Sequence, residues 1–385
     1  MKIVTQVKLI PEADQAAALS ATLHAVNGAA NWVSGVAFDH GVPREYELRK
    51  YTYGELKDRG LGAQAAQHTI KKVCDAYTTL RANMRAGNLG KPGSKRRRKA
   101  ESKPIAFRPE AAHPFDDRCL SWQYDAQTVS IWTTAGRLKN VRFVCSPDAL
   151  KTLREHRKGE ADLIERDGVF YLVAVCEIPE AAPYEPERFI GVDLGIANIA
   201  ITSTGYQAAG RGLNRHRKRQ LDLRAKLQAK GTQSAKRRLK NRRRKEARHA
   251  TNQNHIISKK IVTEAERTSS GIALEDLGGI RQRVRLRKPQ RIILHSWAFY
   301  QLGQFLEYKA RRAGVPLVYV DPAYTSQECA DCHHIDKKNR VDQALFICRS
   351  CGGVAHADRN ASRNIAARGE AAWTAGRESR VPATP

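Results

Sequence analysis

The first part of the chain changes its hydrophobic pattern twice. Apolar and polar residues alternate over residues 1–10, which predicts a strand that Pro11 ends. Over residues 14–85 apolar residues recur every three or four positions, which predicts helices, among them a long one over 67–84. Residues 86–104 are rich in glycine, lysine and arginine and predict an exposed linker.

A β-rich pattern follows in residues 105–178, where short apolar runs are separated by turn residues. A strand, then helices, then further strands predict a small β-barrel with a helical insertion. The expected barrel comprises residues 1–12 and 104–182, and the expected insertion with its basic linker comprises 13–103. Prolines in 177–187 mark a boundary.

The second half of the chain predicts strands and helices in turn. Residues 211–250 carry 17 Lys and Arg against two acidic residues and predict one or two long helices, interrupted near Gly231. The tail from residue 370 is small and polar, which predicts disorder. The other expected elements are an apolar β-hairpin over 188–205, a buried strand within 270–280, an amphipathic helix over 295–314, a strand over 315–322 and a short helix over 356–369.

Composition and charge indicate a partner of opposite charge. Hydrophobic residues make up 41% of the 385, which suits a globular protein of two or three domains. Lys and Arg number 67 against 39 Asp and Glu, so the net charge is +28 and nucleic acid is the first candidate partner. An anionic membrane is the alternative, but no basic helix with a strong apolar face stands out. With no spanning apolar run and no signal-peptide core, we expect a cytoplasmic protein.

Three acids stand where metal-dependent chemistry would need them. Asp193 lies in an otherwise apolar strand, Glu275 ends a buried run, and Asp358 opens a helix. If the strands are neighbours and the helix packs on them, the carboxylates converge. Their mutual repulsion then favours divalent cations such as Mg²⁺ or Mn²⁺, two of which could hydrolyse a phosphodiester.

Each acid also has a simpler interpretation. Asp193 could be a buried, hydrogen-bonded acid, and Asp358 could be a helix N-cap. Asp276 follows Glu275 directly, so spacing alone leaves open which of the two faces a metal.

Four of the eight cysteines form two tight pairs. Cys329 and Cys332, then fifteen residues, then Cys348 and Cys351 match the spacing of a zinc ribbon, and a site closed by four cysteines predicts one structural zinc. An iron–sulfur cluster is the alternative. Nearby histidines (His333, His334 and His356) could compete as ligands, although a surface or nucleic-acid-facing position suits them better.

Basic runs predict phosphate contacts. They lie at 94–99, within 211–250 and at 282–288, the last expected to be a mobile loop beside Glu275.

These motifs together resemble a known family. In chain order, GVDLGIAN, ALEDLGGI, YTSQECADC, CRSCG and ADRNASRNI resemble TnpB, the OrfB-type protein of insertion sequences, which is related to small type V CRISPR effectors. The specific motifs cover residues 188–368, and the general layout covers 1–187. His333 departs from the glycine that the family usually has after the second cysteine.

The resemblance implies an α+β multidomain protein with an oligonucleotide-binding-type β-barrel and its helical recognition insertion. A RuvC-like nuclease domain on an RNase H fold is implied over 188–322 and 356–369, with the zinc ribbon inserted at 323–355. Asp193, Glu275 and Asp358 match the three family acids, which selects Glu275 over Asp276.

The same resemblance implies the partners. They are a guide RNA from the element's own end and double-stranded target DNA beside a short flanking motif, with no membrane and no obligatory protein partner. The protein is then expected in the bacterial cytoplasm, on the nucleoid when bound. The rival hypotheses are an RNA-independent DNA nuclease or transposase, and a non-catalytic nucleic-acid-binding regulator, in which we expect one of the acids to be missing.

Overall fold

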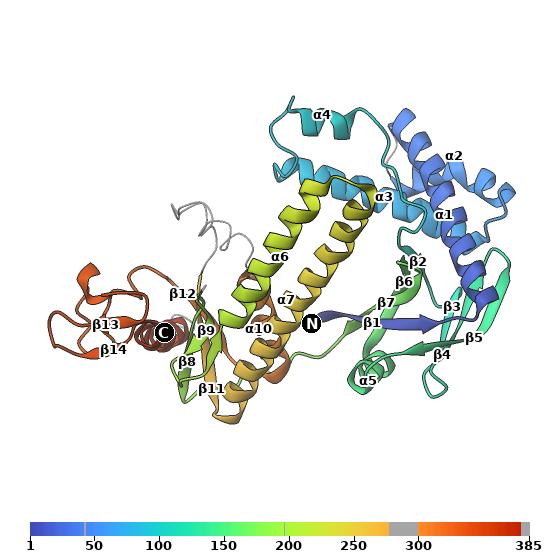
Figure 1. The fold of residues 1–385 in the computed structure, drawn as a ribbon. Helices are drawn as coiled ribbons and strands as arrows, with labels where there is room; N and C mark the ends of the chain where they lie inside the picture. The colour runs from blue at the N-terminus through green and yellow to red at the C-terminus, as the bar shows by residue number, and fades with distance from the viewer. Residues whose placement is uncertain (42–43, 196, 277–298, 379–385) are drawn as a thin grey trace, which may run out of the picture. The chain divides into compact units, whose positions relative to one another are not determined.

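The chain divides into two units, Met1–Ile178 and Pro179–Pro385, and each is built on one large sheet (Figure 1). The structure, a computed structural model, describes residues 1–41, 44–195, 197–276 and 299–378. The expected basic loop at 282–288 lies outside the described residues. Within the described part of the chain, no helix is long and apolar enough to cross a membrane.

The first unit contains a seven-stranded antiparallel sheet of order β2-β6-β7-β1-β5-β4-β3. Strands β2 and β3 lie at opposite edges, yet only residues 116–119 join them in the chain. So short a connection requires the two edges to lie near each other, and the sheet is therefore almost closed. The strands are β1 (Lys2–Ile10), β2 (His113–Phe115), β3 (Leu120–Gln123), β4 (Thr128–Thr133), β5 (Gly136–Val144), β6 (Arg157–Arg166) and β7 (Val169–Glu177).

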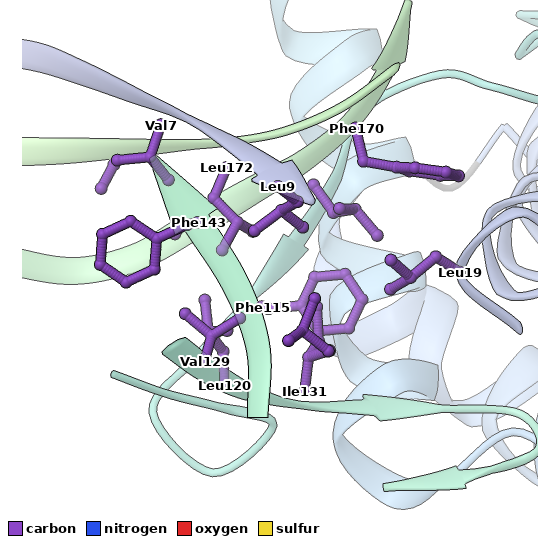
Figure 2. Packing of buried hydrophobic residues seen from close by; sticks show 14 of the residues in the cluster. Val7, Leu9, Leu19, Phe115, Leu120, Val129, Ile131, Phe143, Phe170 and Leu172 are labelled. Atoms are coloured by element: carbon purple, nitrogen blue, oxygen red, sulfur yellow. The ribbon is translucent and has the colours of Figure 1, made fainter. Parts of the chain in front are cut away.

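The core of this unit lies inside the curved sheet (Figure 2). Val7 and Leu9 of β1 are buried, whereas Val4 on the opposite face is exposed, as the alternation in the sequence predicts. Phe143 of β5 and Leu172 of β7 pack on the same inner face (Figure 2). Ser146 caps the start of helix α5 (Pro147–His156), and its hydroxyl accepts a hydrogen bond from the Ala149 backbone N–H.

Four described helices lie between β1 and β2 in the chain. The first three confirm the expected helical segment: α1 (Ala13–Asp39), α2 (Glu45–Asp58) and α3 (Ala63–Arg85). The linker expected at 86–104 is not wholly irregular, because it contains α4 (Lys95–Glu101). The sequence signals for this helix are the Ser94 cap and the ion pair of Arg97 with Glu101 one turn later.

The second unit contains a five-stranded mixed sheet of order β10-β9-β8-β11-β12. Strand β9 is antiparallel to both its neighbours, whereas β11 is parallel to β8 and to β12. The strands are β8 (Arg188–Asp193), β9 (Asn198–Thr202), β10 (Gln207–Ala209), β11 (Ser270–Glu275) and β12 (Leu317–Val320).

Helices cover both faces of this sheet. Helices α7 (Gln233–Arg267) and α10 (Phe299–Ala313) pack on the face formed by Ile190, Val192 and Ile272. Helix α11 (Ala357–Glu378) packs on the other face, where its Ile365 meets Phe189. Strands β8 and β11 therefore have two apolar faces, which is why their sequences read as almost continuous apolar runs.

The basic segment forms an antiparallel helix pair, α6 (Arg211–Lys230) and α7 (Figure 1). The interruption predicted near Gly231 is confirmed, since Gly231 caps α6 in the left-handed conformation at φ +63°. Helix α7 continues past the basic run, and its last part supplies the buried Ile257 and Ile261.

The tail expected to be disordered from residue 370 is helical as far as Glu378, so that prediction is wrong over 370–378. Trp373 provides the reason. Its ring lies 6.0 Å from the ring of Phe189, and its indole N–H donates to Glu185. Residues 379–385 lie outside the described residues.

Candidate functional site

Strand alternation places Asp193 and Glu275 on the same face of the second sheet. Gly191 lies opposite Ala273 in the parallel pair, so the two acids, each two residues further on, emerge side by side at the ends of their strands. This is the face on which α11 packs. Asp358 belongs to the first turn of α11, so the three acids expected from the sequence approach one another at one edge of the sheet.

The electrostatic state of Asp193 shows that the acids interact. Burial, which is the largest cause, and the neighbouring charges of Glu275 and Asp358 together raise the pKa of Asp193 to about 8, against a smaller opposing effect of Arg340. An isolated, hydrogen-bonded buried acid would not show this pattern. A positive charge added beside the carboxylates would favour their ionised forms.

Glu275, rather than Asp276, belongs to this group. Burial raises the pKa of the Glu275 carboxyl, and the Thr325 hydroxyl, which donates to Glu275 Oε1 at 2.5 Å, partly offsets that rise, as does the charge of Arg368. Asp276 is exposed. The geometry thus makes the same choice as the family resemblance.

Asp358 is held by side chains on both of its carboxylate oxygens. Arg340 donates to Oδ1 at 2.9 Å, and Asn198 donates to Oδ2 at 3.0 Å. Gln207 in turn donates to Asn198 Oδ1 at 2.7 Å. The carboxylate therefore accepts from side chains of other elements, whereas an N-cap would accept from backbone amides of its own helix.

The three acids have the donor chemistry for hard divalent cations, since carboxylate oxygens are the ligands that Mg²⁺ and Mn²⁺ prefer. Their oxygens are not gathered closely, however. Among the described residues, the cysteine quartet is the one group of three or more potential ligands whose donor atoms all lie within 4.8 Å of one another.

The cysteine quartet has the geometry of a tetrathiolate site. Its sulfur atoms approach in two pairs, Cys329 with Cys351 at 3.7 Å and Cys332 with Cys348 at 3.5 Å. Backbone N–H groups of Cys351 and Ser350 point at the Cys348 sulfur, and the first of these is the main reason that the pKa of this thiol is lowered. Four such sulfurs suit zinc, as the spacing predicts.

Each cysteine pair ends in a tight turn with positive φ. The residue after the second cysteine is His333 in one turn, at φ +57°, and Gly352 in the other, at φ +72°. Glycine adopts this conformation without strain, which gives a physical reason for the family's usual glycine. His333 Nδ1 donates to the Glu328 carboxylate at 3.0 Å, so the ring faces that carboxylate rather than the sulfurs.

Residues 323–355, the cysteine segment, are fixed to α11 by two asparagines that the sequence analysis did not single out. Asn364 donates to the backbone carbonyl oxygens of Thr325 and Glu328. Asn360 also donates to the carbonyl oxygen of Glu328, and it accepts from the Ala330 backbone N–H. Both are buried. Their spacing of four residues, on the helix that carries Asp358, is the signal that could have found them.

Arg340, Asn198 and Thr325 are further site residues that sequence reasoning did not single out for the triad. Arg340 lies between the two cysteine pairs and outside the motifs that carry the family resemblance. Asn198 lies in the GVDLGIAN motif and Thr325 in YTSQECADC, so membership of the two motifs was the available signal.

Several known proteins are similar to this chain. Residues 299–365 match the family described as Cas12f1-like, TNB domain. A CRISPR-associated endodeoxyribonuclease Cas12f1 of Sulfoacidibacillus thermotolerans is 34% identical over 350 residues, covering 82% of this chain and 80% of the relative. The chain belongs to the TnpB and Cas12f family.

Two further matches extend this assignment. The putative RNA-guided DNA endonuclease InsQ of Escherichia coli K12 is 30% identical to this TnpB-type chain over 230 residues, covering 54% of the chain and 56% of InsQ. The solved structure of the mini-RNA-guided endonuclease CRISPR-Cas_phi3 shares the fold, with a TM-score of 0.54 at 10% identity, and the match covers 95% of this chain and 92% of that one.

Proposed function

We propose that this TnpB-type chain is an RNA-guided, divalent-metal-dependent DNA endonuclease encoded by an insertion sequence. The observation that carries the proposal is the electrostatic coupling of Asp193 to Glu275 and Asp358, which lie on two adjacent parallel strands and a helix packed against them. The names of the relatives, Cas12f1 and InsQ, give the reaction and the RNA guidance.

The proposal assigns a role to each part of the fold. The second sheet with α7, α10 and α11 is the RuvC-like nuclease domain of RNase H type, and its mixed sheet with acids at adjacent strand ends supports this. The nearly closed sheet of the first unit is the oligonucleotide-binding-type barrel, and helices α1 to α3 are the recognition insertion. The cysteine segment is a zinc ribbon with one structural zinc.

In this mechanism Asp193, Glu275 and Asp358 would hold two divalent cations. Such cations lower the pKa of a bound water and stabilise the leaving oxygen of a phosphodiester. The protein's own contribution is to hold the carboxylates. Thr325 donates to one oxygen of Glu275, and Asn198 donates to one oxygen of Asp358, so each acid keeps its other oxygen for a metal or for another partner.

The first experiment tests RNA guidance. The protein is purified after expression with its native flanking DNA, and the bound RNA is sequenced. One discrete species from the flanking region supports the proposal. If no RNA is enriched, the protein would instead be an RNA-independent nuclease or transposase that uses the same triad.

The second experiment tests the triad with a matched pair of neighbours. Glu275→Gln should lower the cleavage rate by at least about a hundredfold and leave nucleic-acid affinity nearly unchanged, because it removes a metal ligand and no phosphate contact. Asp276→Asn, one residue away and exposed, should cleave at close to the original rate. Equal rates for the two variants would contradict the assignment. A fully active Asp193→Ala variant would do so too, whereas absence of cleavage by the original protein would favour the non-catalytic regulator.

A further inference from the structure

One side chain of the cysteine segment contacts the third acid directly. Arg340 lies between the two cysteine pairs in sequence, and its guanidinium forms an ion pair with Asp358 in the first turn of α11. The Asp358 side chain is 11% exposed and that of Arg340 is 29% exposed, so solvent only partly screens this pair. The same guanidinium lowers the pKa of Asp193, which shows that its charge reaches the rest of the triad.

The residue before Arg340 anchors it to the metal-binding turns. Asn339 is completely buried. Its side-chain nitrogen donates to the backbone carbonyl oxygens of Gln327 and His334. Its side-chain oxygen accepts from the backbone N–H of Arg349. His334 follows the first cysteine pair, and Arg349 lies within the second. Asn339 therefore bridges both turns, and the position of Arg340 depends on the fold that the four cysteines hold together.

A divalent cation and the Arg340 guanidinium are alternative partners for the same carboxylate. A cation bound to Asp358 Oδ1 would replace a charge-assisted hydrogen bond of 2.9 Å and would be repelled by a guanidinium that stayed nearby. Asn198 on the other oxygen is neutral and introduces no such repulsion. Arg340 is thus the group on Asp358 that can oppose metal binding.

We propose that the cysteine segment sets the affinity of the acid triad for divalent cations through Arg340, with Asn339 as the positioning residue. Metal binding at Asp358 requires the guanidinium to leave, which frees a cationic, five-donor group beside the metals for a phosphate oxygen. By reciprocity, a phosphodiester that engages Arg340 strengthens metal binding. The inference rests on the proposed function, because it presupposes that the triad binds metal.

The test measures metal affinity rather than cleavage. The full-length, zinc-loaded protein is titrated with Mn²⁺ at pH 8.5, and free Mn²⁺ is counted by electron paramagnetic resonance. Arg340→Gln should bind Mn²⁺ about tenfold more tightly than the original protein, because a nearby like charge is removed. The charge of Arg340 lowers the pKa of Asp193, so its removal raises that pKa. A carboxyl that holds its proton more tightly binds a cation less well. Tighter binding in the variant therefore cannot arise from Asp193.

Asn339→Ala should tighten Mn²⁺ binding less than Arg340→Gln, and the double variant should match Arg340→Gln alone, because both substitutions act on one contact. Arg349→Gln, an exposed arginine on the same segment, should have no effect. Zinc content is measured for every variant. If Asn339→Ala loses zinc, the variants Arg340→Gln and Arg340→Lys still test whether residue 340 sets the affinity for Mn²⁺, because they alter a partly exposed side chain.

The outcomes separate the two proposals. If the original protein shows no Mn²⁺ binding that Asp193→Ala removes, the proposed metal site fails, and this inference fails with it. If that binding is present but Arg340→Gln leaves it unchanged or weaker, the inference alone is overturned. Additive effects of Asn339→Ala and Arg340→Gln would overturn the positioning role of Asn339.

Discussion

Gly191 of β8 and Ser362 of α11 are packed so closely that a Cβ atom at residue 191 would lie 1.9 Å from the Ser362 carbonyl oxygen. The Ala366 backbone nitrogen would lie only 2.4 Å from the same atom. Both clashes are with helix backbone, which cannot rotate away. Asp193 lies two residues beyond Gly191, and Asp358 lies four before Ser362. The missing side chain at residue 191 is thus what allows the helix with the third acid to lie against the strand with the first.

Gly191→Ala is therefore expected to displace α11. We expect a loss of about 3 kcal/mol or more in the free energy of unfolding, because overpacking against backbone has no cheap relaxation. Urea denaturation measures this loss. Gly376→Ala on the same helix is the control. A Cβ there meets nothing within 4 Å, and the variant should be as stable as the original or up to about 1 kcal/mol more stable. Equal stability of the two variants would contradict the packing described.

The raised pKa of Asp193 predicts how stability depends on pH. The carboxyl has a pKa of about 8 in the folded protein against an ordinary value of 3.8, so the folded state holds a proton that the unfolded state releases between these values. Its contribution to stability is fully present below about pH 4 and is lost as the pH rises through about 8, at no more than roughly 1.4 kcal/mol per pH unit.

Asp193→Asn lacks this titration. Without added divalent cations, its stability relative to the original protein should increase from pH 5 to pH 8 and level off above. Urea unfolding at a series of pH values provides the measurement. Parallel pH profiles for the two proteins would show that Asp193 ionises normally. Added Mg²⁺ should reduce the difference, because a bound cation favours the ionised carboxylate.

The sequence was sufficient where periodicity and spacing determine structure. Alternation in β8 and β11 puts Asp193 and Glu275 on one face, and the cysteine spacing predicts the quartet that the structure gathers. It was insufficient for Arg340, since its contact with Asp358 depends on the path of a whole loop between two cysteine pairs. No local periodicity encodes that path. The helix beyond residue 370 was missed for a similar reason, because Trp373 is ordered by a distant partner, Phe189.

Zinc should be required for the fold of residues 323–355. This segment contains short strands, β13 (Leu345–Ile347) and β14 (Val354–His356), and a small core of Phe346 with two of the cysteines. So small a core is marginal without a metal. Elemental analysis should give about one zinc per chain, and Cys348→Ser should lose it.

Loss of zinc should also be visible in the digestion pattern. A strong chelator or Cys348→Ser should expose residues 323–355 to protease, while the first unit, Met1–Ile178, keeps its resistance. Cys145→Ser, a half-buried cysteine of the first unit, is the control and should retain zinc. A zinc-free protein with unchanged protease resistance would contradict a structural role for the metal.

The basic helix α6 is expected to contact a nucleic-acid backbone. Its exposed residues Arg215, Lys218 and Arg219 lie within a segment that carries 17 basic and two acidic residues. Each phosphate contact releases counterions, so affinity for RNA should fall linearly with salt on a logarithmic plot, and removal of one such interaction should reduce the slope by about 0.7. Fluorescence anisotropy of labelled RNA between about 50 and 200 mM salt measures the slope.

Replacing these three residues with glutamine should therefore make the negative slope shallower by about two and weaken binding most at low salt. Gln228→Ala, an exposed neutral position on the same helix, should leave the slope unchanged. An unchanged slope in the triple variant would mean that α6 is only a solvated face. The phosphate contacts would then have to lie on other basic surfaces, because a net charge of +28 still requires a polyanionic partner.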